Sequence, residues 1–165
     1  MEEKDLSLRI WDLLRDASVN TEFMMTEFSS RNKLSRLQGR TMLQIFIQEQ
    51  VRLSDLAEIM GMNPGNLSRV CQSLEHESLL QRERSTEDRR VWTISLTEKG
   101  HKVIREIVGA IEESFKKFLQ DHSKEELEQL VRLWTDYNHY FNQAHRPKRA
   151  AKFSPNANMP IPGPR

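Results

Sequence analysis

Residues 51–100 decide the fold, and they run VRLSDLAEIMGMNPGNLSRVCQSLEHESLLQRERSTEDRRVWTISLTEKG. Ser54 is placed to cap a short helix, and Gly61 is the kind of residue that ends one. Asn63 followed by Pro64 predicts the start of a second helix, because the first turn does not need the N–H that proline lacks. Since about two residues separate the helices, the stretch predicts a sharp helix-turn-helix corner.

The second helix has two contrasting faces. Four apolar side chains recur at helical spacing on one of them: Leu67, Val70, Cys71 and Leu74. The opposite face is polar and carries no acid: Gly65, Asn66, Ser68, Arg69, Gln72, Ser73 and His76. Side chains of these types hydrogen-bond base edges and phosphates in the major groove of DNA. An ordinary solvated face is the alternative for this helix taken alone.

A charged hairpin is predicted after the second helix. Strand-like runs at residues 79–83 and 91–96 enclose the polar segment 84–90. Four arginines can reach phosphates or a narrow minor groove: Arg82, Arg84, Arg89 and Arg90. Asp88 is expected to pair with an arginine and hold that long side chain in a defined direction. Together with the two helices, this hairpin predicts a winged helix-turn-helix.

The hairpin also carries a resemblance to a known family. Asp88-Arg89-Arg90, the strand after it and Thr97-Glu98-Lys99-Gly100 resemble the D-x-R…L-T-x-x-G signature of MarR-family transcriptional regulators. Residues 63–75 resemble the recognition helix of that family, and the similarity extends over roughly residues 5–145. The resemblance implies an obligate dimer on a palindromic operator, with residues 64–78 in the major groove. It also implies that Arg90 enters the minor groove and that Asp88 orients it.

The segments on either side of this stretch are predicted to be helical. Residues 5–30 predict one long helix that is apolar over more than one face. Residues 34–50 predict another, in which Gly39 costs about 1 kcal/mol relative to alanine, and residues 51–53 predict a short strand supporting the hairpin. Beyond the hairpin, Thr97 is expected to cap a long helix, and Ser123 with Glu126 three residues on predicts a capping box for the last one.

The predicted fold class is therefore mainly α with a small β-wing. We expect a winged helix-turn-helix at residues 34–100, and a helical dimerisation region at residues 5–33 and 101–144, since helices with two apolar faces need a second partner. Residues 146–165 hold five of the six prolines, several basic residues and no acid, which is typical of a disordered basic tail. Such a tail is either a solvated end or a non-specific phosphate contact.

Composition limits the other classes of function. The net charge is only +1, but the basic residues concentrate in the hairpin and the tail. One cysteine excludes an intrachain disulfide framework, and no apolar run approaches a membrane span or signal peptide, so we expect a cytoplasmic protein. No nucleophile signature, phosphate loop, dinucleotide fingerprint or metal-ligand spacing is present. We therefore expect that the protein is not an enzyme and that it has no cofactor. Cys71 invites a redox-sensor hypothesis, but its place in the apolar stripe favours an inert thiol.

The leading hypothesis is a homodimeric DNA-binding regulator, more specifically a repressor that responds to a small molecule. The expected DNA contacts are Pro64, Gly65, Asn66, Ser68, Arg69, Gln72, Ser73, Arg84, Asp88, Arg89 and Arg90. The MarR resemblance also implies a small, often aromatic and anionic ligand that lies between the dimer helices and the winged helix. The candidates to line such a site are Trp11, Met24, Phe28, Arg40, Met42 and Phe46. Ordinary core packing is the alternative for each. A winged-helix protein-interaction module and a constitutive DNA-binding regulator remain alternatives for the whole chain.

Overall fold

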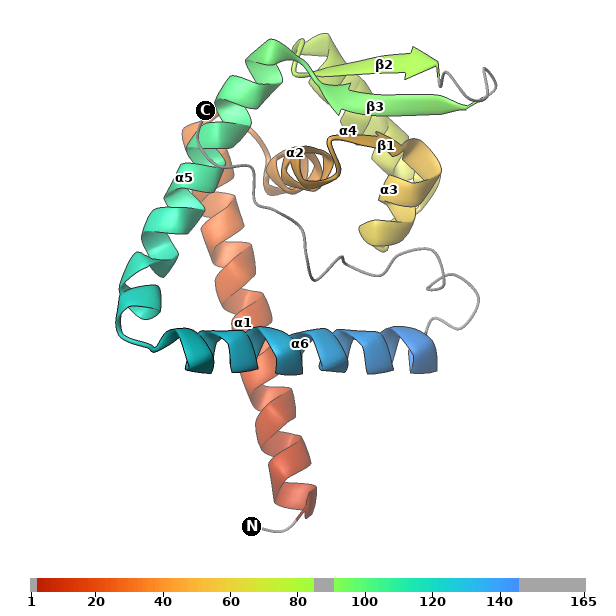
Figure 1. Cartoon of the computed structure of the whole chain (residues 1–165). Helices are drawn as coiled ribbons and strands as arrows, with labels where there is room; N and C mark the ends of the chain where they lie inside the picture. Colours follow the sequence, from red (N-terminus) through yellow and green to blue (C-terminus); the bar gives the residue numbers. More distant parts are fainter. Residues whose placement is uncertain (1–2, 85–90, 146–165) are drawn as a thin grey trace.

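The computed structural model describes residues 3–84 and 91–145 (Figure 1). Over these ranges the elements are α1 (Glu3–Arg31), α2 (Arg36–Gln48), β1 (Gln50–Arg52), α3 (Leu53–Ile59), α4 (Pro64–His76), β2 (Leu80–Arg84), β3 (Trp92–Leu96), α5 (Glu98–Gln120) and α6 (Lys124–His145). The predicted wing tip and basic tail lie outside the described residues.

The strands form a small antiparallel sheet in the order β1-β3-β2. Ile94 lies at its centre, opposite Val51 of β1 on one side and Arg82 of β2 on the other. The short strand β1 supports the hairpin as predicted. With six helices and three strands in the described ranges, the prediction of a mainly α fold with a small β-wing is confirmed.

The corner between α3 and α4 forms as the sequence indicates. Gly61 adopts a positive φ of 64°, and the N–H of Met62 donates to the carbonyl of Ala57, which closes the end of α3. Asn63 caps α4, because its Oδ1 accepts the N–H of Gly65 at 2.9 Å. The prediction that Asn63 and Pro64 begin the second helix is therefore confirmed.

The start of α3 differs from the prediction. Arg52, not Ser54, is its N-cap residue, and no side chain caps this helix. The reason is tertiary: Arg52 pairs with Thr93 in the sheet, so its extended backbone leads directly into the first turn at Leu53. Ser54 lies inside the helix, where its hydroxyl donates to Asp55.

The helix α2 begins with a capping box that the sequence analysis missed. Ser35 Oγ accepts the N–H of Gln38 at 3.2 Å, and Gln38 Oε1 accepts the N–H of Ser35 at 2.8 Å. At the other end Glu49 adopts a φ of 59°, which ends the helix before β1 and shortens it relative to the predicted range.

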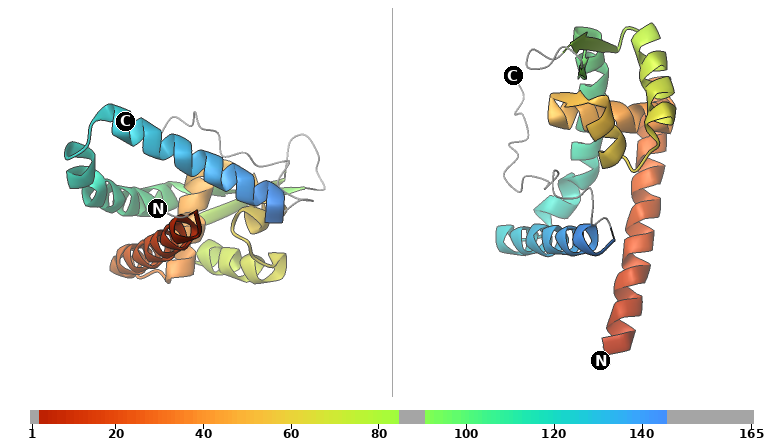
Figure 2. Two further views of the ribbon diagram at one scale, coloured as in Figure 1. Left: turned by 90° about the horizontal axis from the view of Figure 1, so that it is seen from below. Right: turned by 90° about the vertical axis from the view of Figure 1, so that its right-hand side faces the viewer.

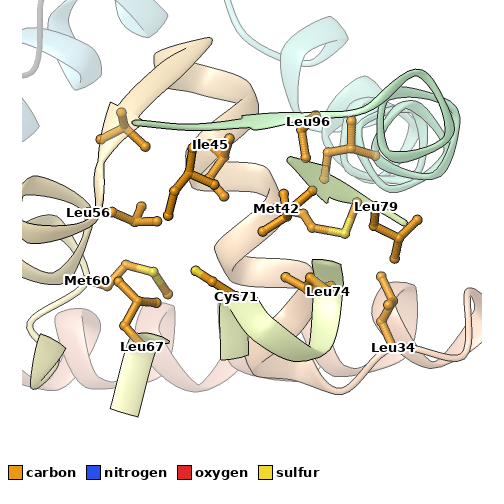
Figure 3. Close-up of a cluster of buried hydrophobic side chains, with 14 of the residues drawn as sticks. Leu34, Met42, Ile45, Leu56, Met60, Leu67, Cys71, Leu74, Leu79 and Leu96 are labelled. Atoms are coloured by element: carbon orange, nitrogen blue, oxygen red, sulfur yellow. The ribbon is translucent and has the colours of Figure 1, made fainter. Parts of the chain in front are cut away.

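One hydrophobic core joins the C-terminal part of α1, the helices α2 to α5 and the sheet (Figure 3). Leu67, Cys71 and Leu74 are completely buried in it, so the predicted apolar stripe of α4 is confirmed. They pack against side chains of neighbouring elements such as Met42 of α2 and Leu56 of α3. Burial of one face fixes the rotation of α4 about its own axis and turns the opposite face to solvent.

Three helices extend away from this core. Figures 1 and 2 show α5 descending from the sheet, α6 running across below it, and the N-terminal half of α1 projecting past the rest of the chain. The capping box predicted for α6 is confirmed, because Ser123 and Glu126 exchange hydrogen bonds at 2.8 and 3.3 Å. No residue of α6 whose side chain is described is buried.

Candidate nucleic-acid interface and adjoining cavity

The solvent face of α4 carries polar side chains with no partner in the described part of the chain. Asn66, Arg69 and Gln72 are exposed, and their side chains make no hydrogen bond or ion pair with any described residue. Pro64 and Gly65 are exposed at the N-terminal turn, and Ser68 is half-buried. A donor-rich face on a helix fixed by its buried stripe is available to bind a rigid polar partner.

The C-terminal end of α4 is fastened to the wing and to α5. Arg82 of β2 forms an ion pair with Glu75 of α4, and one guanidinium nitrogen of Arg82 is buried. Lys99 Nζ donates to the carbonyl of Glu77 at 2.7 Å. The prediction that Arg82 reaches DNA phosphates is therefore wrong, because this arginine is used inside the chain to hold α4 against the sheet.

Ser73 also has a partner within the chain. The amide nitrogen of Gln38, on α2, donates to Ser73 Oγ at 3.2 Å and to Glu77 Oε1 at 3.3 Å. Sequence reasoning missed Gln38, although the Ser-x-x-Gln spacing from Ser35 marks it as a capping residue. Nothing in the sequence indicates that the same amide reaches α4.

The base of the wing presents a stacked pair. Arg84 and Trp92 are directly opposite each other in the last described register position, and the guanidinium lies 5.1 Å from the Trp92 ring centroid. They share the sheet face of Arg82, so they continue the α4-facing side of the hairpin toward its tip. Trp92 remains 47% exposed. Asp88, Arg89 and Arg90, which the sequence analysis assigns to DNA binding, lie outside the described residues.

Cys71 lies on the inner side of α4. Burial raises the pKa of its thiol to about 11, an effect that the Arg82 charge opposes and the Glu75 charge increases. At neutral pH the group is therefore a protonated thiol inside the core, which is the unreactive form.

A cavity of about 540 Å³ lies beside α2, on the side of α1, α5 and α6. Most of its lining is apolar, and the lining residues are Leu14, Ala17, Ser18, Thr21, Glu22, Met24, Met25, Arg36, Leu37, Arg40, Leu43, Gln44, Ile111, Phe115 and Trp134. Arg36 is paired with Glu22 at 2.5 Å. Arg40 is exposed and has no ion-pair or hydrogen-bond partner among the described residues, so the cavity carries one uncompensated cation.

The six residues predicted to line a ligand site are not brought together. Met24 and Arg40 line the cavity. Phe28 and Met42 are buried in the core, and Phe46 packs against that core with its ring edge near His101. Trp11 is 68% exposed on the projecting part of α1 and is not among the lining residues.

Other site chemistries find no support in the described ranges 3–84 and 91–145. No group of three or more histidine, cysteine, aspartate or glutamate side chains there could hold a metal ion. None of the helices in those ranges is long and apolar enough to cross a membrane.

The fold and the exposed helix define a winged helix-turn-helix protein. A family model described as "Transcriptional regulator SarA/Rot" matches residues 24–107, which is more than half of the 165-residue chain. The chain therefore belongs to the SarA/Rot family of transcriptional regulators. The prediction that it is a regulator and not an enzyme is confirmed by this family.

Solved structures of MarR-type regulators share the fold. A MepR–DNA complex from S. aureus is 22% identical, with a TM-score of 0.63, and the match covers 78% of this chain and 95% of that chain. Apo MarR from E. coli is 16% identical, with a TM-score of 0.61 and coverage of 76% and 93%. YusO from Bacillus subtilis is 21% identical, with a TM-score of 0.55 and coverage of 84% and 99%. These likenesses confirm the winged-helix fold that the MarR resemblance implies.

Proposed function

We propose that the chain acts in the cytoplasm as a homodimeric repressor that presents α4 to the major groove of a palindromic operator. The observation that carries this proposal is the face of Asn66, Arg69 and Gln72: three exposed donors, unpartnered among the described residues, on a helix whose other face is buried. Arginine, asparagine and glutamine are the side chains that bind guanine and adenine edges bidentately. The structures of MepR bound to DNA and of a MarR mutant complexed with operator DNA support the same use of this fold.

We propose the other DNA contacts from the place of each residue on α4 or on the wing. We assign base reading to Asn66, Arg69 and Gln72, and backbone contacts to the N-terminal turn of α4 and to the serines: Pro64, Gly65, Ser68 and Ser73. Because Ser73 already accepts a hydrogen bond from Gln38, its hydroxyl proton is the part left for a phosphate. In the wing, Arg84 and Arg89 bind phosphates, and Arg90 enters the minor groove with Asp88 orienting it.

The dimer is proposed from the helices outside the core. Large apolar side chains are exposed along α1, the end of α5 and α6: Leu6, Leu8, Ile10, Trp11, Leu13, Val19, Phe23, Phe115, Phe118, Leu119, Leu130, Val131, Leu133, Trp134, Tyr140 and Phe141. A monomer rarely leaves so many large apolar side chains in water, and a two-fold interface would bury them against each other. Two copies of α4 would then face successive major grooves about 34 Å apart.

The cavity beside α2 supports a small-molecule effector. Its apolar lining with aromatic Phe115 and Trp134 suits a flat hydrophobic body, and Arg40, which has no partner among the described residues, suits a carboxylate or sulfonate. Met24 is the other predicted ligand residue at this cavity. We therefore propose an anionic aromatic effector that shifts the distance between the two recognition helices.

The experiment that tests this function begins with selection of bound duplexes from a random-sequence library, followed by anisotropy titrations of a labelled selected duplex. Arg69→Ala is compared with Arg105→Ala, which removes the same charge from an exposed site on α5. We expect Arg69→Ala to weaken binding by about 1 to 3 kcal/mol and to relax the preference at one base position. Arg105→Ala should leave the selected sequence unchanged.

Ionic strength separates DNA binding from protein binding by the same surface. Phosphate neutralisation makes the logarithm of affinity fall steeply with the logarithm of salt concentration. A wild-type chain that selects no sequence and binds duplexes without a salt slope would contradict the proposal and favour a protein-interaction module.

A further inference from the structure

Gln38 joins the first turn of α2 to the end of α4. Its amide oxygen accepts the N–H of Ser35 at 2.8 Å, and its amide nitrogen donates to Ser73 Oγ at 3.2 Å and to Glu77 Oε1 at 3.3 Å. Both ends of one amide are thus used, one to cap α2 and the other to hold α4. Any rotation or shift of the first turn of α2 must move or break the contacts to α4.

The same turn of α2 forms a wall of the cavity. Arg36, Leu37 and Arg40 line it, and Gln38 lies between them in the sequence. No residue of α4 is among the lining residues, so the cavity and the DNA-facing helix have α2 between them. The ion pair from Arg36 to Glu22 ties this turn to α1 across the cavity.

We propose that Gln38 is a positioning residue that transmits displacement of the cavity wall to α4. The proposal rests on the proposed function, in which α4 binds DNA and the cavity binds an effector. An anionic effector bound by Arg40 also attracts Arg36, one helical turn away, and so weakens the Arg36–Glu22 ion pair. The first turn of α2 then shifts, and the Gln38 contacts carry that shift to Ser73 and Glu77. A mutation can remove the exposed Gln38–Glu77 contact without removing the cap that Gln38 provides to α2.

Exchanging the amide of Gln38 and the carboxylate of Glu77 tests whether the contact between them positions α4. Gln38→Glu keeps an acceptor for the Ser35 N–H and for the Ser73 hydroxyl but places a carboxylate against Glu77, so the tie to Glu77 is lost while α2 keeps its cap. We expect the affinity for a labelled duplex, selected from the random library, to fall about five-fold without a lower thermal unfolding midpoint. The double variant Gln38→Glu/Glu77→Gln keeps the net charge and reverses the pair, and it should restore the affinity.

Two results of that exchange would overturn the proposal. Unchanged affinity in Gln38→Glu would show that the contact does not position α4. Loss of affinity that Glu77→Gln fails to restore would show that the added acid, or a weaker α2, is responsible.

A substitution in the cavity wall tests, without a ligand, whether a displacement of that wall is transmitted to α4. Glu22→Gln breaks the tie from α1 to Arg36, and Glu27→Gln is the matched control because Glu27 pairs with Arg31 on its own helix. Duplex affinity is measured for both, in wild-type and Gln38→Glu backgrounds, at concentrations where sedimentation shows the same oligomer. We expect Glu22→Gln to change duplex affinity about three-fold in the wild-type background and to have no effect in the Gln38→Glu background. Glu27→Gln should leave the affinity unchanged in both backgrounds.

The outcomes of this second test are distinct from failure of the proposed function. If Glu22→Gln has no effect, or an equal effect in both backgrounds, Gln38 does not transmit and the inference is overturned. If the wild-type chain binds no selected duplex, the proposed function itself fails before any variant is compared.

Discussion

Ser29 of α1 packs directly against Gly39 of α2 at the point where the two helices meet. A Cβ at position 39 would lie 2.0 Å from Ser29 Oγ and 2.9 Å from Ser29 Cβ. Ser29 is fully buried, and its hydroxyl has no hydrogen-bond partner among the described residues. A glycine in mid-helix is thus explained by close approach of two helices and not by flexibility of α2.

Gly39→Ala is expected to destabilise the fold although alanine is the better helix former. The clash should lower the free energy of unfolding by about 1 to 3 kcal/mol, whereas helix propensity alone would raise it by about 1 kcal/mol. Urea denaturation measures the sign directly. Ser29→Ala in the same chain should recover part of the loss, and a more stable Gly39→Ala variant would contradict the close approach.

Cys71 should make stability depend on alkaline pH. The folded thiol has a pKa of about 11 against an ordinary value of 9.0, so the unfolded chain loses its proton first. This contribution is fully present below pH 9 and decreases toward pH 11, by roughly 1.4 kcal/mol per pH unit. Urea titrations from pH 8 to 11 should show this slope in the wild type and a shallower one in Cys71→Ala. Equal slopes would mean that Cys71 titrates normally.

The stacked pair at the base of the wing should contribute to DNA affinity in two ways. If Arg84 binds a phosphate, Arg84→Ala lowers affinity and reduces the salt slope by about one unit. Trp92→Ala removes only the ring that holds the guanidinium, so it should cost about 0.5 to 1 kcal/mol with an unchanged slope. Anisotropy titrations at several salt concentrations distinguish the two. A reduced slope in Trp92→Ala would contradict an orienting role.

The exposed N-terminal half of α1 should be needed for dimerisation. Trp11→Glu places a charge in the proposed apolar interface, while Asn20→Glu adds the same charge to a polar, exposed position of the same helix. Sedimentation equilibrium should show that Trp11→Glu raises the dimer dissociation constant at least about ten-fold, equivalent to about 1.4 kcal/mol, and that Asn20→Glu changes it little. Equal behaviour of the two variants would exclude Trp11 from the interface.

The helix-turn-helix could be predicted from the sequence because its signals are local. Gly61, Asn63 and Pro64 set the corner through their own backbone preferences, and Leu67 and Leu74 mark the buried face by spacing. The start of α3 could not be predicted in this way, because sheet pairing of Arg52 overrides the capping preference of Ser54.

The cavity and the ties to α4 depend on tertiary structure. Periodicity shows that Phe28 and Met42 point inward, but it does not distinguish a packed core from a cavity wall. The ion pair of Arg82 with Glu75 and the contacts of Gln38 with α4 join residues that are 7 to 39 positions apart in sequence, so one sequence alone gives no signal for them.

The central claim is that two copies of α4 bind one duplex a groove repeat apart. The most direct measurement is the stoichiometry and spacing dependence of the complex with the selected duplex, by sedimentation and anisotropy. The account predicts two chains per duplex, a two-fold symmetric site, and loss of tight binding when about five base pairs, half a helical turn, are inserted at its centre. A single chain per duplex, or affinity that is indifferent to the insertion, would contradict it.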